Sequence, residues 1–172
     1  MSKPMRPGIG LLWLLWVCLP AAASADVGQN TESWRLEVSD PQGVTIASAP
    51  LPETGEWCLL WNHSVQGFPV ADCFRMNAEQ LFLDSTHTPD FAAGLGYIEG
   101  RGRLESDQNH GYRIKDMNVP IAGNVLPLRV GSTRVRHRIE IGDRVLELSP
   151  VASGQRVQIR ITPYRSEGTH SP

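Results

Sequence analysis

Apolar and polar residues alternate along most of this chain, and no segment keeps a helical period over several turns. The alternation is clearest at residues 34–38 and 156–162. Because successive side chains of a strand point to opposite faces, a period of two predicts strands with one buried face. Closely spaced turn signals separate these runs, such as the Asp-Pro-Gln-Gly sequence at residues 40–43. We therefore expect an all-β fold, a single antiparallel β-sandwich or open barrel.

The clearest predicted hairpin covers residues 135–148. A Gly-Asp pair at residues 142–143 is a natural two-residue connection, which places residue 141 opposite residue 144. In this register Ile139 faces Leu146 and His137 faces Leu148, all on the buried side. We interpret His137 as a hydrogen-bonded core residue, with a catalytic role as the less favoured alternative.

The other side of this hairpin carries a stripe of charged residues, and Arg138 is expected to form a cross-strand ion pair with Glu147. An exposed, solvated face is the simpler interpretation of this stripe. The alternative is a docking surface for an acidic partner or a carboxylate ligand, because arginine binds carboxylates through two parallel hydrogen bonds. The stripe consists of Arg134, Arg136, Arg138, Glu140 and Glu147.

Residues 56–64 and 70–76 form a second predicted hairpin, whose loop length the sequence leaves open. A symmetric pairing about residues 65 and 66 sets Cys58 opposite Cys73, Trp57 opposite Phe74, and Trp61 opposite Val70. In that register Trp57 and Trp61 share the buried face with residue 63. Opposed cysteines on neighbouring strands are close enough for a disulfide, and two buried thiols are the alternative.

The start of the chain has the three parts of a secretory signal. Lys3 and Arg6 precede an apolar run at residues 9–19, and small residues at positions 21–25 end in an Ala-x-Ala cleavage site. The apolar run is shorter than the roughly 20 residues that cross a bilayer. We expect a signal peptide at 1–25, a disordered linker at 26–33, one all-β domain at 34–164, and a disordered tail at 165–172. An uncleaved signal would be the only membrane contact.

After cleavage, 14 of the 16 basic residues and all 18 acidic residues remain, a formal charge of −4. This balance argues against nucleic acid as a partner. Two cysteines, Cys58 and Cys73, also remain, and an even count in an exported chain indicates a disulfide.

Glycines interrupt the pattern from Thr86 to Gly111, and we expect this long segment to be largely irregular. Such a loop could build a small-ligand or metal site together with His63 or Asp72. However, no two histidines have a chelating spacing, so the expected metal site is none. We expect no cofactor either.

The chain lacks the nucleophile elbow, phosphate loop, dinucleotide and zinc-protease motifs. His63 and Ser64 could be offered as base and nucleophile of a hydrolase. Adjacent strand residues point to opposite faces, so their side chains would diverge unless the strand ends there. We expect no enzymatic activity, and a hydrolase is the least favoured alternative.

Several short motifs in order resemble the domain of unknown function 1850 family. The first is His63-Ser64-Val65, followed by residues 69–70 and the acidic Asp72. The segment at residues 91–95, which includes Gly94, is similar to a glycine-rich segment of that family. Residues 126–131 and the His137 hairpin resemble its closing part. The resemblance covers about residues 57–148.

Members of that family are small exported proteins, commonly encoded beside components of TAXI-type TRAP transporters. The resemblance implies a periplasmic accessory module that binds a ligand or a partner, which could be the membrane subunit or the solute-binding subunit of the transporter. The family has no assigned reaction. The resemblance assigns a tentative ligand- or partner-binding role to His63, Ser64, Asp72, Gly94, Arg129 and His137.

Overall fold

The computed structural model describes residues 33–90, 99–107 and 111–164. The expected signal peptide, residues 26–32 of the expected linker, and the expected tail lie outside this range. Most of the described residues are in strands, and all of them belong to one compact unit. No helix in the described ranges has the length and apolar character that a membrane span requires.

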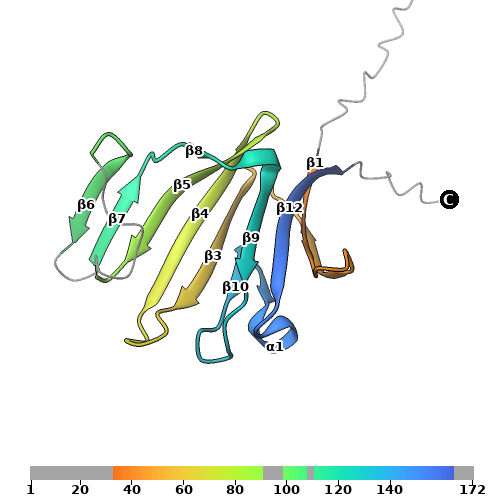
Figure 1. The fold of residues 1–172 in the computed structure, drawn as a ribbon. Helices are drawn as coiled ribbons and strands as arrows, with labels where there is room; N and C mark the ends of the chain where they lie inside the picture. Colours follow the sequence, from red (N-terminus) through yellow and green to blue (C-terminus); the bar gives the residue numbers. More distant parts are fainter. Residues whose placement is uncertain (1–32, 91–98, 108–110, 165–172) are drawn as a thin grey trace, which may run out of the picture. The chain divides into compact units, whose positions relative to one another are not determined.

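The strands form two open antiparallel sheets, so the all-β expectation is confirmed and the architecture is a sandwich (Figure 1). The smaller sheet has the order β2-β1-β12-β9, with β1 (Ser33–Ser39), β2 (Thr45–Pro50), β9 (Val125–Arg129) and β12 (Arg156–Tyr164). The larger sheet has the order β11-β10-β3-β4-β5-β7-β6, with β8 beside β5.

The strands of the larger sheet are β3 (Glu56–Asn62), β4 (Pro69–Asn77), β5 (Gln80–Thr88), β6 (Arg103–Asp107), β7 (Gly111–Lys115), β8 (Val119–Pro120), β10 (Arg138–Ile141) and β11 (Arg144–Glu147). In the described ranges two short helices, η2 (Ala122–Asn124) and α1 (Ser149–Ala152), lie between strands.

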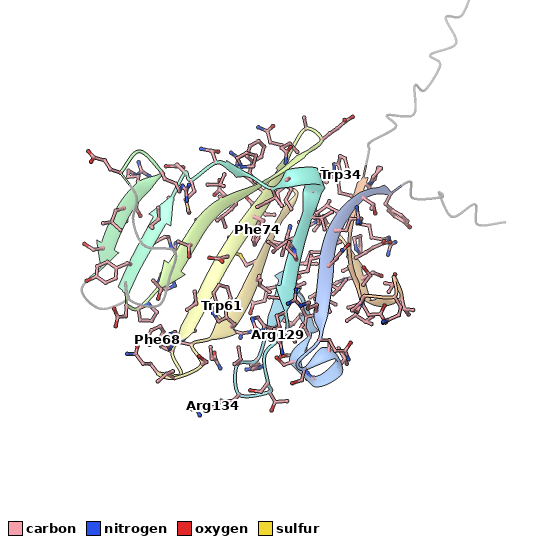
Figure 2. The ribbon with its side chains drawn as sticks, in the orientation of Figure 1. Trp34, Trp61, Phe68, Phe74, Arg129 and Arg134 are labelled. Atoms are coloured by element: carbon pink, nitrogen blue, oxygen red, sulfur yellow. A yellow bond between two sulfur atoms is a disulfide. The ribbon has the colours of Figure 1, made fainter. Side chains whose placement is uncertain are left out.

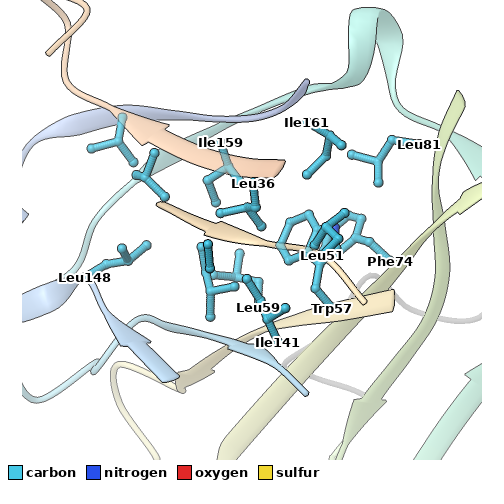
Figure 3. Packing of buried hydrophobic residues seen from close by; sticks show 14 of the residues in the cluster. Leu36, Leu51, Trp57, Leu59, Phe74, Leu81, Ile141, Leu148, Ile159 and Ile161 are labelled. Carbon is cyan, nitrogen blue, oxygen red and sulfur yellow. The ribbon is translucent and has the colours of Figure 1, made fainter. Parts of the chain in front are cut away.

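One hydrophobic core receives side chains from the inner faces of both sheets (Figure 3). Leu36 and Ile159 come from the smaller sheet, and Trp57, Leu59 and Ile139 come from the larger one. Each of these five side chains is at most 5% exposed. Burying a large apolar side chain contributes about 1.5–3 kcal/mol, so this shared core is what holds the sheets together.

The register of the first hairpin, β3 with β4, is the expected one. Cys58 lies opposite Cys73, and the two form a disulfide on the face turned away from the core. On the inner face Trp57 lies opposite Phe74, and their rings stack with centroids 4.4 Å apart. The covalent bond and the stack fix the same pair of strands from opposite faces.

The second hairpin, β10 with β11, also has the expected register, with Ile139 opposite Leu146. Two expectations about it are wrong. The strand begins at Arg138 rather than at residue 135, and Glu147 forms its ion pair with Arg136, at 2.8 Å. Arg136 has a left-handed backbone (φ 52°), which ends the alternation and turns its side chain toward Glu147.

The segment from Thr86 to Gly111 is more regular than expected. Strand β5 continues to Thr88, and β6 lies within this segment. Strand β5 pairs with β4 on one side and with β7 on the other, so its polar end still has its backbone hydrogen bonds satisfied. The end of β5 is therefore a strand because it pairs with β4 and β7, although its sequence has no apolar period that would predict one.

Candidate functional site

The turn between β3 and β4 is braced by the side chain of His63. Its Nδ1 accepts hydrogen bonds from the backbone N–H groups of Val65, at 3.4 Å, and Gln66, at 3.2 Å. Its ring stacks on Phe68, with centroids 5.1 Å apart. This is the role that Asp or Asn side chains often play in turns. His63 therefore holds the shape of the turn.

This position of His63 differs from the expected one. Strand β3 ends at Asn62, so His63 does not join the buried face of the strand. The reason is local, because Nδ1 can reach the N–H groups of the turn only if the chain leaves the strand. Ser64 is exposed, and in the described part of the chain no hydrogen bond joins its hydroxyl to His63.

His137 braces the loop between β9 and β10. Its Nδ1 accepts a hydrogen bond from the N–H of Gly131 at 2.9 Å, and its backbone N–H donates to Ser149 Oγ at 2.9 Å. Ser149 Oγ in turn donates to the carbonyl of Gly131 at 3.0 Å. Burial lowers the pKa of His137, which favours the neutral ring that can accept at Nδ1. The inward, hydrogen-bonded histidine is the one expected from the hairpin pattern.

These two braced loops lie at the same end of the larger sheet. The N–H of Asn62 donates to the carbonyl of Val135 at 2.6 Å, and its side-chain amide lies 3.4 Å from the carbonyl of Arg134. The ring of Trp61 stacks near the ring of His137, with centroids 6.1 Å apart. We call residues 62–68 and 131–137 together the two-loop end (Figure 2).

The two-loop end displays one apolar side chain and one cation. Val65 is 76% exposed, which is the highest value among the exposed large hydrophobic residues of the described chain. Arg134 is exposed too, and within the described ranges it has no ion-pair partner. Such a combination on a braced scaffold is suited to contact with a protein surface, because rigid loops lose little entropy on binding.

Asp72 occupies a different place, on the inner face of β4. It lies opposite Leu59 of β3 and Thr86 of β5. Asp72 Oδ1 and Thr86 Oγ1 are buried without a hydrogen-bond partner in the part of the chain that the structure describes. Burial raises the pKa of Asp72, and the nearby Thr86 hydroxyl offsets this only in part. The two side chains are close, but they fall short of hydrogen-bond geometry.

Asp72 and His63 do not share a site. Asp72 lies opposite Leu59 of β3. His63 is four residues beyond Leu59 along the chain, which corresponds to a separation of roughly 13 Å, because a strand rises about 3.3 Å per residue. Both side chains could not reach one ion, since metal–ligand bonds are about 2 Å long. Among the described residues, no three His, Cys, Asp or Glu side chains gather as metal ligands would.

Two tentative residues remain. Arg129 is the exposed last residue of β9 in the smaller sheet, two residues before the two-loop end begins at Gly131. Gly94 lies outside the described residues. The structure therefore brings His63 and Ser64 to the same end as His137, places Arg129 at the strand that leads into this end, and leaves Asp72 on the inner face of β4.

Sequence reasoning missed two members of the brace around His137. Gly131 is part of a motif of the family resemblance, but nothing in the sequence shows that its N–H meets an imidazole. A Cβ at Gly131 would lie 2.7 Å from Cβ of Val135, so the loop requires glycine. Ser149 lies 12 residues from His137, and only the folding of β10 and β11 brings them together.

The comparison with known proteins agrees with the resemblance described above. A family model, described as Domain of unknown function (DUF1850), matches residues 58–148. This range runs from the first disulfide cysteine to the end of the second hairpin, and it includes the two-loop end. No curated protein and no solved structure matches the chain significantly.

Proposed function

This chain belongs to the DUF1850 family, and from that premise we propose that it is a non-enzymatic, exported accessory module that binds a protein partner through its two-loop end. In this proposal the partner is a subunit of a TAXI-type TRAP transporter, either the membrane subunit or the solute-binding subunit. Binding takes place in the periplasm.

The observation that carries the proposal is that two histidines hold the shape of neighbouring loops through hydrogen bonds. His63 and His137 each accept backbone N–H groups through Nδ1. The lone pair of this nitrogen is therefore used in each imidazole to hold a loop. Val65 is exposed on one of the two braced loops, and Arg134 is exposed on the other. Preorganised loops with an apolar tip and a cation resemble the centre of a protein interface more than a reaction centre.

Export is supported by the start of the chain and by the cysteines. The first 25 residues have the composition of a secretory signal, and Cys58 and Cys73 form a disulfide. Disulfides persist in oxidising compartments such as the bacterial periplasm. The link to TRAP transport depends on the family resemblance alone.

Co-purification with the transporter subunits tests this function. We expect the wild-type protein to retain the membrane subunit or the solute-binding subunit, and Val65→Asp to lose it, because the substitution places a charge at the centre of the contact. Val44→Asp is the matched control, since Val44 is 59% exposed in the turn between β1 and β2. Equal recovery with both variants, or normal solute uptake after deletion of the gene, would count against the proposal.

A second candidate function has one specific observation in its favour. Asp72 Oδ1 and Thr86 Oγ1 are buried polar atoms without partners, and such groups usually meet a water, an ion or a ligand. A small molecule with a hydrogen-bond donor for the carboxylate would satisfy them. Native mass spectrometry of the purified protein checks this function, which requires a retained small molecule and is contradicted by a bare protein mass.

A further inference from the structure

The two sheets of the sandwich differ in charge. The strands of the smaller sheet carry four arginines and one acidic residue, a formal charge of +3, whereas the strands of the larger sheet carry six basic and seven acidic residues, a charge of −1. The expected mature chain is acidic overall, so the positive charge of the smaller sheet is a local feature. Its charged residues are Arg35, Glu37, Arg129, Arg156 and Arg160.

All four arginines project from the outer face of this sheet. The inner face of β12 is buried through Val157, Ile159 and Ile161, so the alternate residues Arg156 and Arg160 point outward. Arg129 is the cross-strand partner of Arg156, and Arg35 lies on the outward-facing row of β1. We call this surface the arginine face.

Arg129 and Arg156 are an unfavourable pair. Like charges directly opposite each other on neighbouring strands destabilise a sheet. Both side chains are exposed, and neither has an ion-pair partner among the described residues. The second hairpin differs, because there Arg136 pairs with Glu147 and Arg138 lies 3.3 Å from Glu140. Four of the arginines that lack an ion-pair partner among the described residues therefore share the arginine face, whereas Arg113 and Arg144 lie on separate strands of the larger sheet, β7 and β11.

We infer that the arginine face is a docking surface for a protein that presents a cluster of Asp and Glu side chains. An arginine fork binds a carboxylate through two parallel hydrogen bonds, and an acidic cluster would remove the repulsion between Arg129 and Arg156. This inference rests on the protein being a partner-binding module and goes beyond the proposed function, because it assigns a second contact surface, separate from the two-loop end, and the chemistry of what binds there.

Composition favours a protein partner over a lipid surface. Arginine and tyrosine are enriched in protein interfaces and lysine is depleted. The strands of the smaller sheet contain no lysine, and the guanidinium of Arg35 lies 4.1 Å from the ring centroid of Tyr164. None of the exposed large hydrophobic residues of the described chain belongs to these strands, so the face offers nothing to insert into a bilayer.

A synthetic poly-glutamate peptide is the direct probe. We expect the purified protein to bind this peptide at low salt and to lose affinity as salt rises, as exposed charge pairs do. The double variant Arg129→Glu with Arg156→Glu should bind about tenfold more weakly, because two attractions become repulsions. The matched double variant Arg113→Glu with Arg144→Glu makes the same charge change on exposed positions of the larger sheet, and it should bind like the wild type.

The single variant Arg129→Glu distinguishes a loss of binding from a loss of folding. It converts the like-charge pair into an opposite-charge pair with Arg156, so it should melt no lower than the wild type and still bind the peptide more weakly. Equal loss in both double variants, or no binding by the wild type, would overturn the inference. Binding to phosphatidylglycerol vesicles without binding to the peptide would overturn it as well, as would self-association that the arginine substitutions abolish. Co-purification with transporter subunits is a separate measurement, so either proposal can fail alone.

Discussion

The fold gives different environments to two ionisable side chains, the buried His137 and the half-buried Asp72, whose Oδ1 atom is buried. Nδ1 of His137 has a backbone donor, and its backbone N–H has the Ser149 hydroxyl. Asp72 Oδ1 has no hydrogen-bond partner among the described residues. A hydrogen bond made by a buried polar group contributes about 0.5–1.5 kcal/mol to stability, whereas a buried polar group without a partner costs roughly 1–3 kcal/mol. His137 therefore supports the fold, and Asp72 lowers its stability.

We expect Asp72→Asn to raise the free energy of unfolding at neutral pH, by on the order of 1 kcal/mol, because it removes the charge of a carboxyl group whose burial disfavours the ionised form more than the Thr86 hydroxyl favours it. Since burial raises the pKa of Asp72 above its ordinary value of 3.8, the penalty is complete above the folded-state pKa. It shrinks as pH falls from there toward 3.8. Urea denaturation at several pH values measures this trend.

Asp84→Asn is the matched control for this substitution. Asp84 lies on the neighbouring strand β5, and its carboxylate is 2.7 Å from Nε of Arg75. Removing its charge should lower stability or leave it unchanged. A loss of stability in Asp72→Asn as large as that in the control would show that Asp72 has a stabilising partner.

The stability of the folded protein should decrease in mild acid because of His137. Burial lowers the pKa of His137 below its ordinary value of 6.5, so the unfolded chain takes up the proton first. The free energy of unfolding therefore falls as pH drops below about 6.5, until the folded-state pKa is passed. In His137→Asn the side-chain oxygen can still accept from Gly131, but it does not titrate. This variant should lose that part of the acid dependence, and an unchanged pH profile would contradict the role of His137.

At the scale of single elements, the loop between β9 and β10 is shaped by close packing as well as by hydrogen bonds. Gly131 donates to His137 on one side, and on the other side its backbone lies against Val135. No side chain fits between them. The loop therefore combines a small residue with a histidine acceptor, and neither feature alone would define its path.

We expect Gly131→Ala to destabilise the protein by about 1–3 kcal/mol, because the added Cβ would overlap three carbons of Val135 at 2.7–2.9 Å. Adding Val135→Ala removes two of these three carbons and should restore part of the loss. Thermal denaturation of the single and double variants forms a double-mutant cycle that measures this coupling. Additive effects would show that the two residues are not in contact.

Elements differ in how well the sequence predicts them. Both hairpins have the predicted register, because a short connection, a period of two and a pair of cysteines all act locally. The end of β3 and the start of β10 were wrong by two or three residues, because His63 and Arg136 leave the strands to make contacts within loops. Strand β8, with two residues, and the helix α1, with four, had no signal, since each spans only about one period and a periodic pattern needs several.

At the scale of the molecule, the two sheets share one core and have different outer faces. The larger sheet balances its charges with ion pairs such as Arg75 with Asp84 and Lys115 with Glu105. On the smaller sheet the four arginines share the outer face with a single acidic residue, Glu37, which lies opposite Arg160, and in the described ranges no ion pair joins any of them. Such segregation cannot be predicted from net charge, because it arises only when β1, β9 and β12 come together.

Local sequence patterns are enough to predict the all-β class, the buried face of the main strands and the register of the two hairpins. These follow from the period of two and from turns that join neighbouring residues. The pairing of Ser33 with Tyr164, the position of Arg129 opposite Arg156, and the meeting of the two histidine-braced loops at Asn62 are known only from the folded protein. Alternation predicts which face of a strand is buried, but it carries no information about which distant strand will cover that face or pair with the edge of the strand.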